Sequence, residues 1–329
     1  MRDSPVVPTV DFDADGVQHG FLRLPWSRDE SAWGNLMIPV SVVRNGGGPT
    51  ALLSGACHGD EYEGPIALVD LARTLDPKAV SGRVIIVPFM NFPAFRAGRR
   101  LSPVDGGNMN RIFPGRPDGG VTEKIADYFQ RTLLPMADIV LDYHSGGRTL
   151  EFVPFAACHM QADKTQEARS VAARDAFGAP YSMTMLEIDA VGMYDTAAEA
   201  LGKVFVTTEL GGGGTTTART AAIAKRGVRN VLKHAGILDG AVERETSVDL
   251  GMPDTNCFIF SESEGMIEPA VDLGEMVRRG DLLARVWPVG RLGAAPAEYR
   301  ARLDGMLAAR HFPGLIGVGD CLAVIALVQ

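Results

Sequence analysis

The stretch SGACHGDEYEG, residues 54–64, places His58 three positions before Glu61, with glycines on both sides. Imidazole nitrogens and carboxylate oxygens are both ligands that zinc accepts in proteins, so the pair forms half of a candidate metal site. The spacing also fits a histidine at a helix start followed by an acid in the first turn, which the helix dipole favours. The pair alone does not decide between these interpretations, and the rest of the chain has to supply the other ligands.

Two further polar groups follow apolar runs that predict buried strands. His144 ends the run DIVLDYH, and Glu209 ends the run KVFVTTE. In an open α/β sheet, ligands bind beyond the carboxyl ends of the strands, so all four side chains converge if these strands are neighbours. Two histidines and one carboxylate with an open fourth position are a common catalytic zinc set, and a second acid beside them could take a proton from water.

Asp142 lies two residues before His144, on the same face of the predicted strand. A carboxylate there could hydrogen-bond a ligand histidine and fix its tautomer. A buried acid paired with a backbone donor fits the sequence equally well. Glu63 is an alternative ligand to Glu61, but its spacing of five residues from His58 is poor geometry on a helix.

A long passage rich in glycine and proline, residues 96–120, predicts an extended loop, and such loops usually carry function or are disordered. Its motif NMNRIFPG contains Asn110 and Arg111. A guanidinium presented from a loop suits bidentate capture of a substrate carboxylate, and Asn110 could add a hydrogen bond. An arginine in a loop is also often only solvated. Arg99 and Arg100 add positive charge locally to a chain of net negative charge.

The remaining metal-binding residue types carry weaker signals. The four cysteines are scattered and form no CxxC pair, so we expect buried thiols in a reducing compartment. Cys57 precedes His58, but neighbours on a strand point to opposite faces, so we expect no role for this thiol at a metal. His159, at a predicted strand end, either lines the pocket or makes local hydrogen bonds.

The elements that must position these residues follow from the hydrophobic pattern. Strands are predicted at 19–26, 35–48, 50–59, 82–91, 138–147 and 203–214. Helices are predicted at 63–75, 122–137, 165–176 and 217–237. Continuous apolar strands that alternate with helices indicate an α/β fold with a mixed, largely parallel sheet flanked by helices. Short β runs later in the chain predict a catalytic domain at 1–240 and a smaller β-rich C-terminal domain at 241–329.

The composition is that of a globular protein with a sizeable core, since the chain has 329 residues, 46% of them hydrophobic and 22% charged. A formal net charge of −8 argues against nucleic acid or an anionic membrane as the main partner. The N-terminal residues are polar and acidic, and no apolar run approaches the length of a membrane span. We therefore expect a soluble cytoplasmic protein with a small-molecule partner. A homo-oligomer is compatible with the sequence, which does not indicate the oligomeric state.

Four motifs, SGACHGDEYEGP, DGGNMNRIFPG, LDYHSGG and TTELGGGG, together resemble those of the succinylglutamate desuccinylase/aspartoacylase family, a branch of the zinc carboxypeptidase-like fold. They span roughly residues 50–215, and the two-part architecture extends the resemblance over nearly the whole chain. The longer segments RLSPVDGGNMNRIFPG and ELGGGGTTT are most similar to those of the branch that deacetylates N-acetyl-2,4-diaminobutyrate in ectoine degradation.

The resemblance implies one zinc ion per chain, held by His58, Glu61 and His144. It also implies that Glu209 is the catalytic residue that moves the proton between water and the leaving amine. The glycines at 211–214 are not expected to cradle a phosphate, because no GK[ST] sequence follows them. They would instead let the backbone turn close to the metal.

Asn110 and Arg111 match the Asn-Arg pair that fixes the substrate carboxylate in the family. An upstream arginine polarises the scissile carbonyl in relatives, and Arg100 is the better candidate here, with Arg99 as its competitor. The implied activity is zinc-dependent hydrolysis of a small N-acyl amino acid, most similar to deacetylation of N-acetyl-L-2,4-diaminobutyrate. Alternatives are hydrolysis of N-acetylaspartate, N-succinylglutamate or a peptide C-terminus. A non-catalytic binding protein with the same fold is a more distant alternative.

Overall fold

The computed structural model describes residues 2–185 and 190–329. The strands of the first part are β1 (Val7–Pro8), β2 (Gly16–Pro25), β3 (Asn35–Asn45), β4 (Thr50–Gly55), β5 (Gly82–Val87), β6 (Ile139–His144), β7 (Leu150–Phe152), β8 (Phe155–His159), β9 (Tyr181–Met185) and β10 (Val204–Glu209). The α-helices are α1 (Glu63–Thr74), α2 (Phe92–Ala97), α3 (Val121–Tyr128), α4 (Leu134–Met136), α5 (Lys164–Phe177), α6 (Tyr194–Glu199) and α7 (Ala218–His234). The C-terminal strands are β11 (Val248–Gly251), β12 (Phe258–Phe260), β13 (Gly265–Pro269), β14 (Met276–Val277), β15 (Leu282–Trp287), β16 (Ala297–Arg300), β17 (Gly305–His311), β18 (Leu315–Ile316) and β19 (Cys321–Val328). The described residues also form short 3-10 helices at η1 (Pro77–Ala79), η2 (Met109–Arg111) and η4 (Thr255–Cys257), and a π-helix at η3 (Phe129–Leu133).

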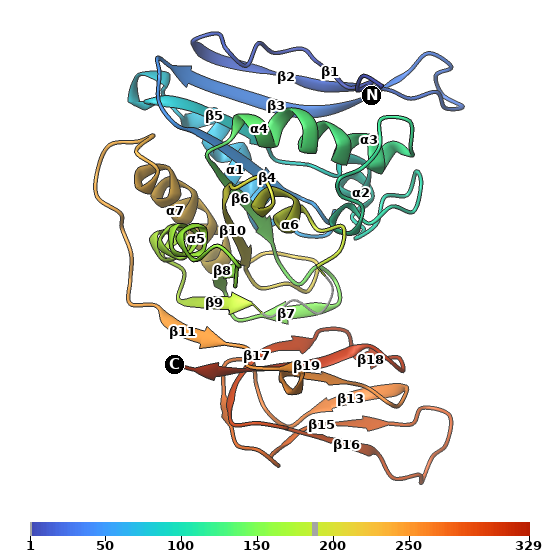
Figure 1. Ribbon diagram of the computed structural model, residues 1–329. Coiled ribbons are helices and arrows are strands. Elements are labelled where there is room, and N and C mark those ends of the chain that lie inside the picture. Colours follow the sequence, from blue (N-terminus) through green and yellow to red (C-terminus); the bar gives the residue numbers. More distant parts are fainter. Residues whose placement is uncertain (1, 186–189) are drawn as a thin grey trace.

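A long mixed sheet with helices on both faces leads into a smaller antiparallel sheet (Figure 1). The long sheet has the strand order β1-β2-β3-β5-β4-β6-β10-β8-β9-β11-β19-β17-β14, with β12 on β19 and β7 on β17. The first strands, β1 to β3, run antiparallel to one another. The α/β fold with a β-rich C-terminal part is confirmed.

Four neighbouring strands, β5, β4, β6 and β10, are parallel and form the centre of the long sheet. They are almost entirely buried, which explains why their sequences are continuous apolar runs rather than alternating ones. The register pairs Ser54 with Asp142 and His144 with Glu209. The carboxyl ends of β4, β6 and β10 therefore meet side by side, as the convergence of the candidate residues requires.

Helices cover both faces of this centre and enclose two hydrophobic cores. One core contains Phe177 from α5 and Val228 from α7, packed with Leu141 of β6. The other contains Phe129 from η3 and Tyr194 from α6. Figure 1 shows α5 and α7 on one side of the strands and α3, α4 and α6 on the other. Within residues 2–185 and 190–329, no helix has both the length and the apolar character needed to cross a bilayer.

The strands beside the candidate site are shorter than predicted, since each ends where its polar turn begins. The strand predicted at 50–59 ends at Gly55, because Ala56 adopts a left-handed conformation with a φ of 51°. β6 and β10 likewise end before their glycines, and the glycines at 211–214 all have positive φ values. The predicted loop at 96–120 contains the end of α2 and the 3-10 helix η2.

After α7 the chain joins the far end of the same long sheet before it forms the second one. β11 pairs in parallel with β9 and antiparallel with β19, and β7 pairs with β17. A shared core contains Phe155 and Met183 from the first part and Met306 and Val324 from the C-terminal part. The second sheet has the order β16-β15-β13-β18. Hydrogen bonding between strands thus crosses residue 240, and the division into two domains there stays a prediction.

Gly64 lets α1 pack closely onto β6, because a Cβ atom at this position would lie 2.1 Å from Cβ of Tyr143. Both residues are buried, and the Tyr143 hydroxyl donates a hydrogen bond to Ala224 O in α7 at 2.7 Å, so the ring has no room to move. We expect Gly64→Ala to lower the free energy of unfolding by about 2 kcal/mol, because overpacking outweighs a helix-propensity gain of about 1 kcal/mol. Denaturant or thermal unfolding measures the change.

Gly47→Ala is the matched control. Gly47 lies in the turn between β3 and β4, and a Cβ atom there would have no heavy atom within 4 Å. This variant should unfold at the same midpoint as the wild type. Equal stability of Gly64→Ala and wild type would contradict the close packing of α1 on β6.

Candidate metal centre and active site

The segment after β4 turns sharply and delivers two candidate ligands to the end of the sheet. Ala56 takes its left-handed conformation directly after the strand. Gly59 then packs so closely on α2 that a Cβ atom would lie 2.0 Å from the backbone carbonyl carbon of Ala94. These constraints fix His58 and Glu61 at the carboxyl end of β4, beside the end of β6.

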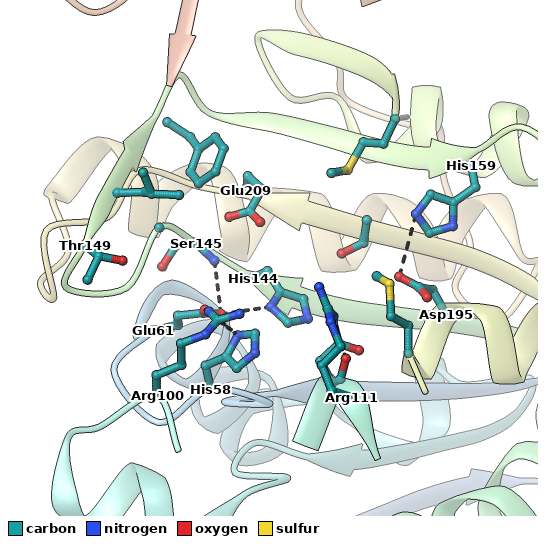
Figure 2. A pocket seen from close by; sticks show the side chains of 17 residues that line it. His58, Glu61, Arg100, Arg111, His144, Ser145, Thr149, His159, Asp195 and Glu209 are labelled. Carbon is teal, nitrogen blue, oxygen red and sulfur yellow. Dashed lines mark hydrogen bonds and ion pairs between the residues drawn. The ribbon is translucent and has the colours of Figure 1, made fainter. Parts of the chain in front are cut away.

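Figure 2 shows His58, Glu61 and His144 meeting at one end of a pocket. The Glu61 carboxylate lies between the two imidazoles, with Oε1 2.7 Å from His58 Nδ1 and Oε2 3.0 Å from His144 Nδ1. One ligand atom from each residue lies within 4.8 Å of the other two, and all three side chains are buried. The structure thus brings the three predicted ligands together from two strand ends.

The second nitrogen of each imidazole faces an oxygen acceptor outside this triad. His144 Nε2 is 2.9 Å from Asp142 Oδ2, and the Ser54 hydroxyl donates to Asp142 Oδ1 at 2.7 Å. His58 Nε2 is 3.3 Å from Asn108 Oδ1. An acceptor at Nε2 keeps the proton there and leaves the Nδ1 lone pair for a metal. Asp142 thus makes the contact to a ligand histidine, His144, that the sequence suggested. Asn108 makes the corresponding contact to His58.

Burial and mutual charge shift the pKa values of the triad. Burial alone would raise the pKa of Glu61, but His58 and His144 outweigh it and hold that pKa well below its usual range. Burial alone would lower the pKa of His144, yet the charges of Glu61 and Asp142 raise it well above its ordinary value. Burial lowers the pKa of His58, opposed by Glu61 and aided by Arg100. The carboxylates of Glu61 and Asp142 therefore favour a positive charge at this end of the pocket.

Glu209 ends β10 opposite His144 in the register and lines the same pocket. Burial raises the pKa of Glu209 to about 8, and the negative charge of Glu61 adds to the rise. Its Oε2 atom is buried and has no hydrogen-bond partner among the residues that the structure describes. A buried oxygen without a hydrogen bond destabilises the fold unless a ligand in the pocket donates one to it. A buried acid with a shifted pKa in a cleft is also typical of a functional site.

The donor set of the triad fits a divalent metal ion such as zinc. Two imidazole nitrogens and one carboxylate oxygen are the protein ligands of many catalytic zinc sites, which keep a further position open. The ionised Glu61 supplies the negative charge, and the acceptors at the two Nε2 atoms favour the tautomer whose Nδ1 can ligate a metal. Glu209 lies next to the triad, and its Oε2 atom has no hydrogen-bond partner among the described residues.

Cys57 lies against His144, so the expectation that it would face away from the site was wrong. With Asp142 and His144 it forms a second group whose ligand atoms lie within 4.8 Å of one another. Strand alternation does not apply to it, because β4 has already ended at Gly55. Burial raises the pKa of the Cys57 thiol to about 12, however, and a thiol has to lose its proton to ligate a metal. The triad is therefore the better metal site.

Glu63, the alternative ligand, turns toward α7 instead of His58. The Thr220 hydroxyl of α7 donates to Glu63 Oε1 at 3.1 Å. Burial raises the pKa of Glu63 to about 7, which favours its protonated form relative to an ordinary glutamate. This residue joins α1 to α7 and is not among the residues that line the pocket.

Both arginines are exposed, but Arg100 reaches the triad, whereas Arg99 is not among the residues that line the pocket. Arg100 Nη1 lies 3.2 Å from His58 Nδ1 and 3.9 Å from Glu61 Oε1, and the side chain lines the pocket. The backbone carbonyl of Arg99 accepts a hydrogen bond from Gly59 N at 2.9 Å. The geometry favours Arg100 over Arg99 as the cation beside a reacting group.

Asn110 and Arg111 belong to η2 and line the pocket. Tyr194 N donates to Asn110 Oδ1 at 2.9 Å, so the amide nitrogen is the end of this side chain that can donate to a ligand. The Arg111 side chain extends into the middle of the pocket in Figure 2. Both residues are thus placed to offer N–H donors to an anion, as the sequence motif predicted.

The pocket encloses about 250 Å³ and has a second polar wall away from the triad. Asp195, in the first turn of α6, and His159, at the end of β8, form this wall, with Asp195 Oδ2 3.6 Å from His159 Nε2. His159 Nδ1 is also 3.2 Å from Glu199 Oε1. His159 therefore both lines the pocket and bonds locally. The sequence analysis did not predict Asp195 as a pocket residue, because neither a motif nor a periodic pattern surrounds it.

Known proteins match the chain over its whole length. Residues 47–235 match the family model of the succinylglutamate desuccinylase/aspartoacylase catalytic domain. The chain is 57% identical, over all of its length and 96% of the relative, to the N-alpha-acetyl-L-2,4-diaminobutyric acid deacetylase of Halomonas elongata.

Solved structures of relatives superpose closely on this one. The product-bound ectoine utilization protein EutE (DoeB) from Ruegeria pomeroyi is 63% identical, with a TM-score of 0.98 over 99% of this chain and 100% of that one. A succinylglutamate desuccinylase from a Silicibacter species is 62% identical, with a TM-score of 0.97 over 100% of both chains. The chain therefore belongs to the succinylglutamate desuccinylase/aspartoacylase family.

Proposed function

We propose that this protein is a zinc-dependent amidohydrolase that removes the acetyl group from Nα-acetyl-L-2,4-diaminobutyrate. The observation that carries the proposal is the buried Glu209 Oε2, which has no partner among the described residues and lies beside the triad of His58, Glu61 and His144. The similar Halomonas elongata protein is named as a deacetylase of this compound, and the Ruegeria pomeroyi protein as an ectoine utilization protein. We place the enzyme in ectoine degradation in the cytoplasm on that basis.

One zinc ion per chain would be held by Nδ1 of His58, the Glu61 carboxylate and Nδ1 of His144. When bound, zinc would polarise the acyl carbonyl and make water easier to deprotonate. Asp142 and Asn108 keep the two imidazoles oriented through their Nε2 atoms. Ser145 N donates to Glu61 Oε2 at 3.2 Å and steadies the shared carboxylate.

Glu209 acts as the base that takes a proton from the attacking water and then as the acid that returns it to the leaving amine. Burial favours the protonated form of its carboxyl group, which suits the second role, because an ordinary carboxyl group holds a proton poorly at neutral pH. Arg100 stabilises the negative charge that forms on the acyl oxygen in the tetrahedral intermediate. Asn110 and Arg111 bind the α-carboxylate and thereby hold the amide bond against Glu209.

A panel of N-acyl amino acids tests the substrate and the metal together. We expect the highest kcat/KM for Nα-acetyl-L-2,4-diaminobutyrate, compared with N-acetylaspartate and N-succinylglutamate, with release of the free amine as the measurement. A chelator should abolish activity, and added zinc should restore it as the metal content returns. Full activity after metal depletion would contradict the zinc assignment, and a preference for N-acetylaspartate would contradict the substrate.

Glu209→Gln should lower kcat by about 10³-fold while zinc stays bound, because it removes the proton-transfer group and keeps its shape. Steady-state kinetics and metal analysis of the same preparation measure the two effects. Glu63→Gln is the matched control, since Glu63 is also a buried glutamate with a raised pKa but faces Thr220. It should retain most of the activity. Near-normal turnover of Glu209→Gln would show that another group is the base.

Arg111→Ala should raise KM about 100-fold with a much smaller change in kcat, because a charged hydrogen bond to the substrate carboxylate is worth about 1.5–3 kcal/mol. Arg99→Ala is the matched control, since Arg99 is a nearby arginine whose side chain is exposed. It should leave KM within about twofold of the wild type, as surface substitutions usually have small effects. An unchanged KM in Arg111→Ala would remove this residue from the substrate site.

A further inference from the structure

Charged side chains line both ends of the pocket, and a bound metal ion beside Arg100 would make the triad end positive. Figure 2 shows Asp195 and His159 far from Arg100 and His58, with Arg111 between the two groups. Asp195 is only 6% exposed and His159 only 5% exposed, and both line the pocket. An acid that is held in the protein interior at the edge of a ligand cavity is placed to meet the ligand's charge.

The wall around Asp195 stays negative whichever protonation state His159 takes. His159 Nε2 is 3.6 Å from Asp195 Oδ2, and its Nδ1 is 3.2 Å from Glu199 Oε1. One imidazole thus lies between two carboxylates. A protonated His159 leaves these three side chains with one net negative charge, and a neutral His159 leaves them with two. A cation at this wall would be stabilised in both cases.

The surfaces next to this wall suit a short aliphatic chain. Met185 at the end of β9 is in register with His159, and Met193 immediately precedes α6. Both methionines line the pocket, as does Thr207, two residues before Glu209 on β10. Thioether side chains pack well against methylene groups, and the Thr207 hydroxyl offers an acceptor. The wall therefore combines an apolar approach with a carboxylate.

We propose that Asp195 is a specificity-determining residue that binds the free ammonium group of the substrate, an inference that rests on the proposed function. The side-chain amine of Nα-acetyl-L-2,4-diaminobutyrate is protonated at neutral pH and lies two methylene groups from the carbon that carries the carboxylate and the amide. With the carboxylate at Arg111 and the acyl group at the triad, this short chain points to the wall of Asp195. The ammonium then forms a charge-assisted hydrogen bond to the carboxylate.

The same charge excludes other substrates of the family's chemistry. N-acetylaspartate and N-succinylglutamate carry an additional carboxylate, which Asp195 would repel at this wall. The opposite end of the pocket cannot take the ammonium, because Arg100 and a metal cation would repel it there. Asp195 therefore both selects the cationic substrate and fixes its direction in the pocket.

The test compares two substrates of equal shape in wild type and in Asp195→Asn. Nα-acetyl-L-norvaline replaces the ammonium group of Nα-acetyl-L-2,4-diaminobutyrate by a methyl group. We expect the wild type to prefer the ammonium substrate in kcat/KM, and Asp195→Asn to lower that preference about 100-fold, mainly through KM. The rate of acetate release from Nα-acetyl-L-norvaline and the zinc content should differ little between Asp195→Asn and the wild type. Asn keeps an oxygen that can accept the hydrogen bond from Thr196 N, so the fold of α6 should persist.

Asp70→Asn is the matched control, because Asp70 lies on α1 at the surface and pairs with Lys225 Nζ at 3.5 Å. It removes the same charge without touching the pocket and should leave the substrate preference unchanged. A preference that survives in Asp195→Asn, or an equal loss with both substrates, would overturn the inference.

Equilibrium binding separates this inference from the proposed function. Calorimetry of the zinc-loaded protein with free L-2,4-diaminobutyrate and free L-norvaline gives a ratio of Kd values that does not depend on turnover. We expect Asp195→Asn to reduce the ratio of the Kd for L-norvaline to the Kd for L-2,4-diaminobutyrate, as it reduces the kinetic preference. No acetate release from either substrate would refute the deacetylase function, while equal Kd ratios in wild type and variant would refute the role of Asp195.

Discussion

One buried carboxylate, that of Glu61, is shared by two imidazoles, and the rest of the site depends on this contact. Its oxygens lie 2.7 Å from His58 Nδ1 and 3.0 Å from His144 Nδ1. A buried charge is tolerated only when it is paired and hydrogen-bonded, and here Ser145 N and the cation Arg100 complete the set. Any displacement of β4 against β6 would leave the carboxylate uncompensated. The protein therefore has to hold two strand ends and one loop in fixed register.

The parallel register of β4, β6 and β10 provides that rigidity. His144 and Glu209 are paired in the ladder, so the candidate metal ligand and the proposed proton-transfer acid cannot move independently. The glycines after Glu209 let the backbone turn immediately beside the neighbouring segment, since a Cβ atom at Gly212 would lie 2.0 Å from Leu150 O. Helices on both faces bury the strands, so the reactive groups emerge only where the strands end.

The sequence predicts the parts of the site that end continuous apolar strands. His144 and Glu209 stand out because a polar residue follows a buried run, and the strand neighbours could be expected from the α/β alternation. Cys57 was assigned to the wrong side because the left-handed turn at Ala56, a residue type that rarely adopts it, has no visible signal. Asp195 could not be predicted, since α6 is only six residues long and its contact with β8 exists only in the folded chain. Local patterns thus reveal strand ends, whereas walls built from short helices need the tertiary structure.

The charges of the pocket form one electrostatic system. Burial and, to a smaller extent, the charge of Glu61 raise the pKa of Glu209, and a cation bound to Glu61 would oppose the rise and favour the Glu209 carboxylate. A filled metal centre would therefore increase the fraction of Glu209 that is ionised and able to accept a proton, which would link the proposed proton transfer to metal binding. Asp195 at the far wall also favours a cation, which we propose is the substrate ammonium group. A substrate bound in reverse would place its ammonium beside Arg100 and the metal, where two like unit charges at 4 Å repel by about 4 kcal/mol at an effective dielectric constant of about 20. On the proposed assignment, the separation of the two ends would set the direction in which the substrate binds.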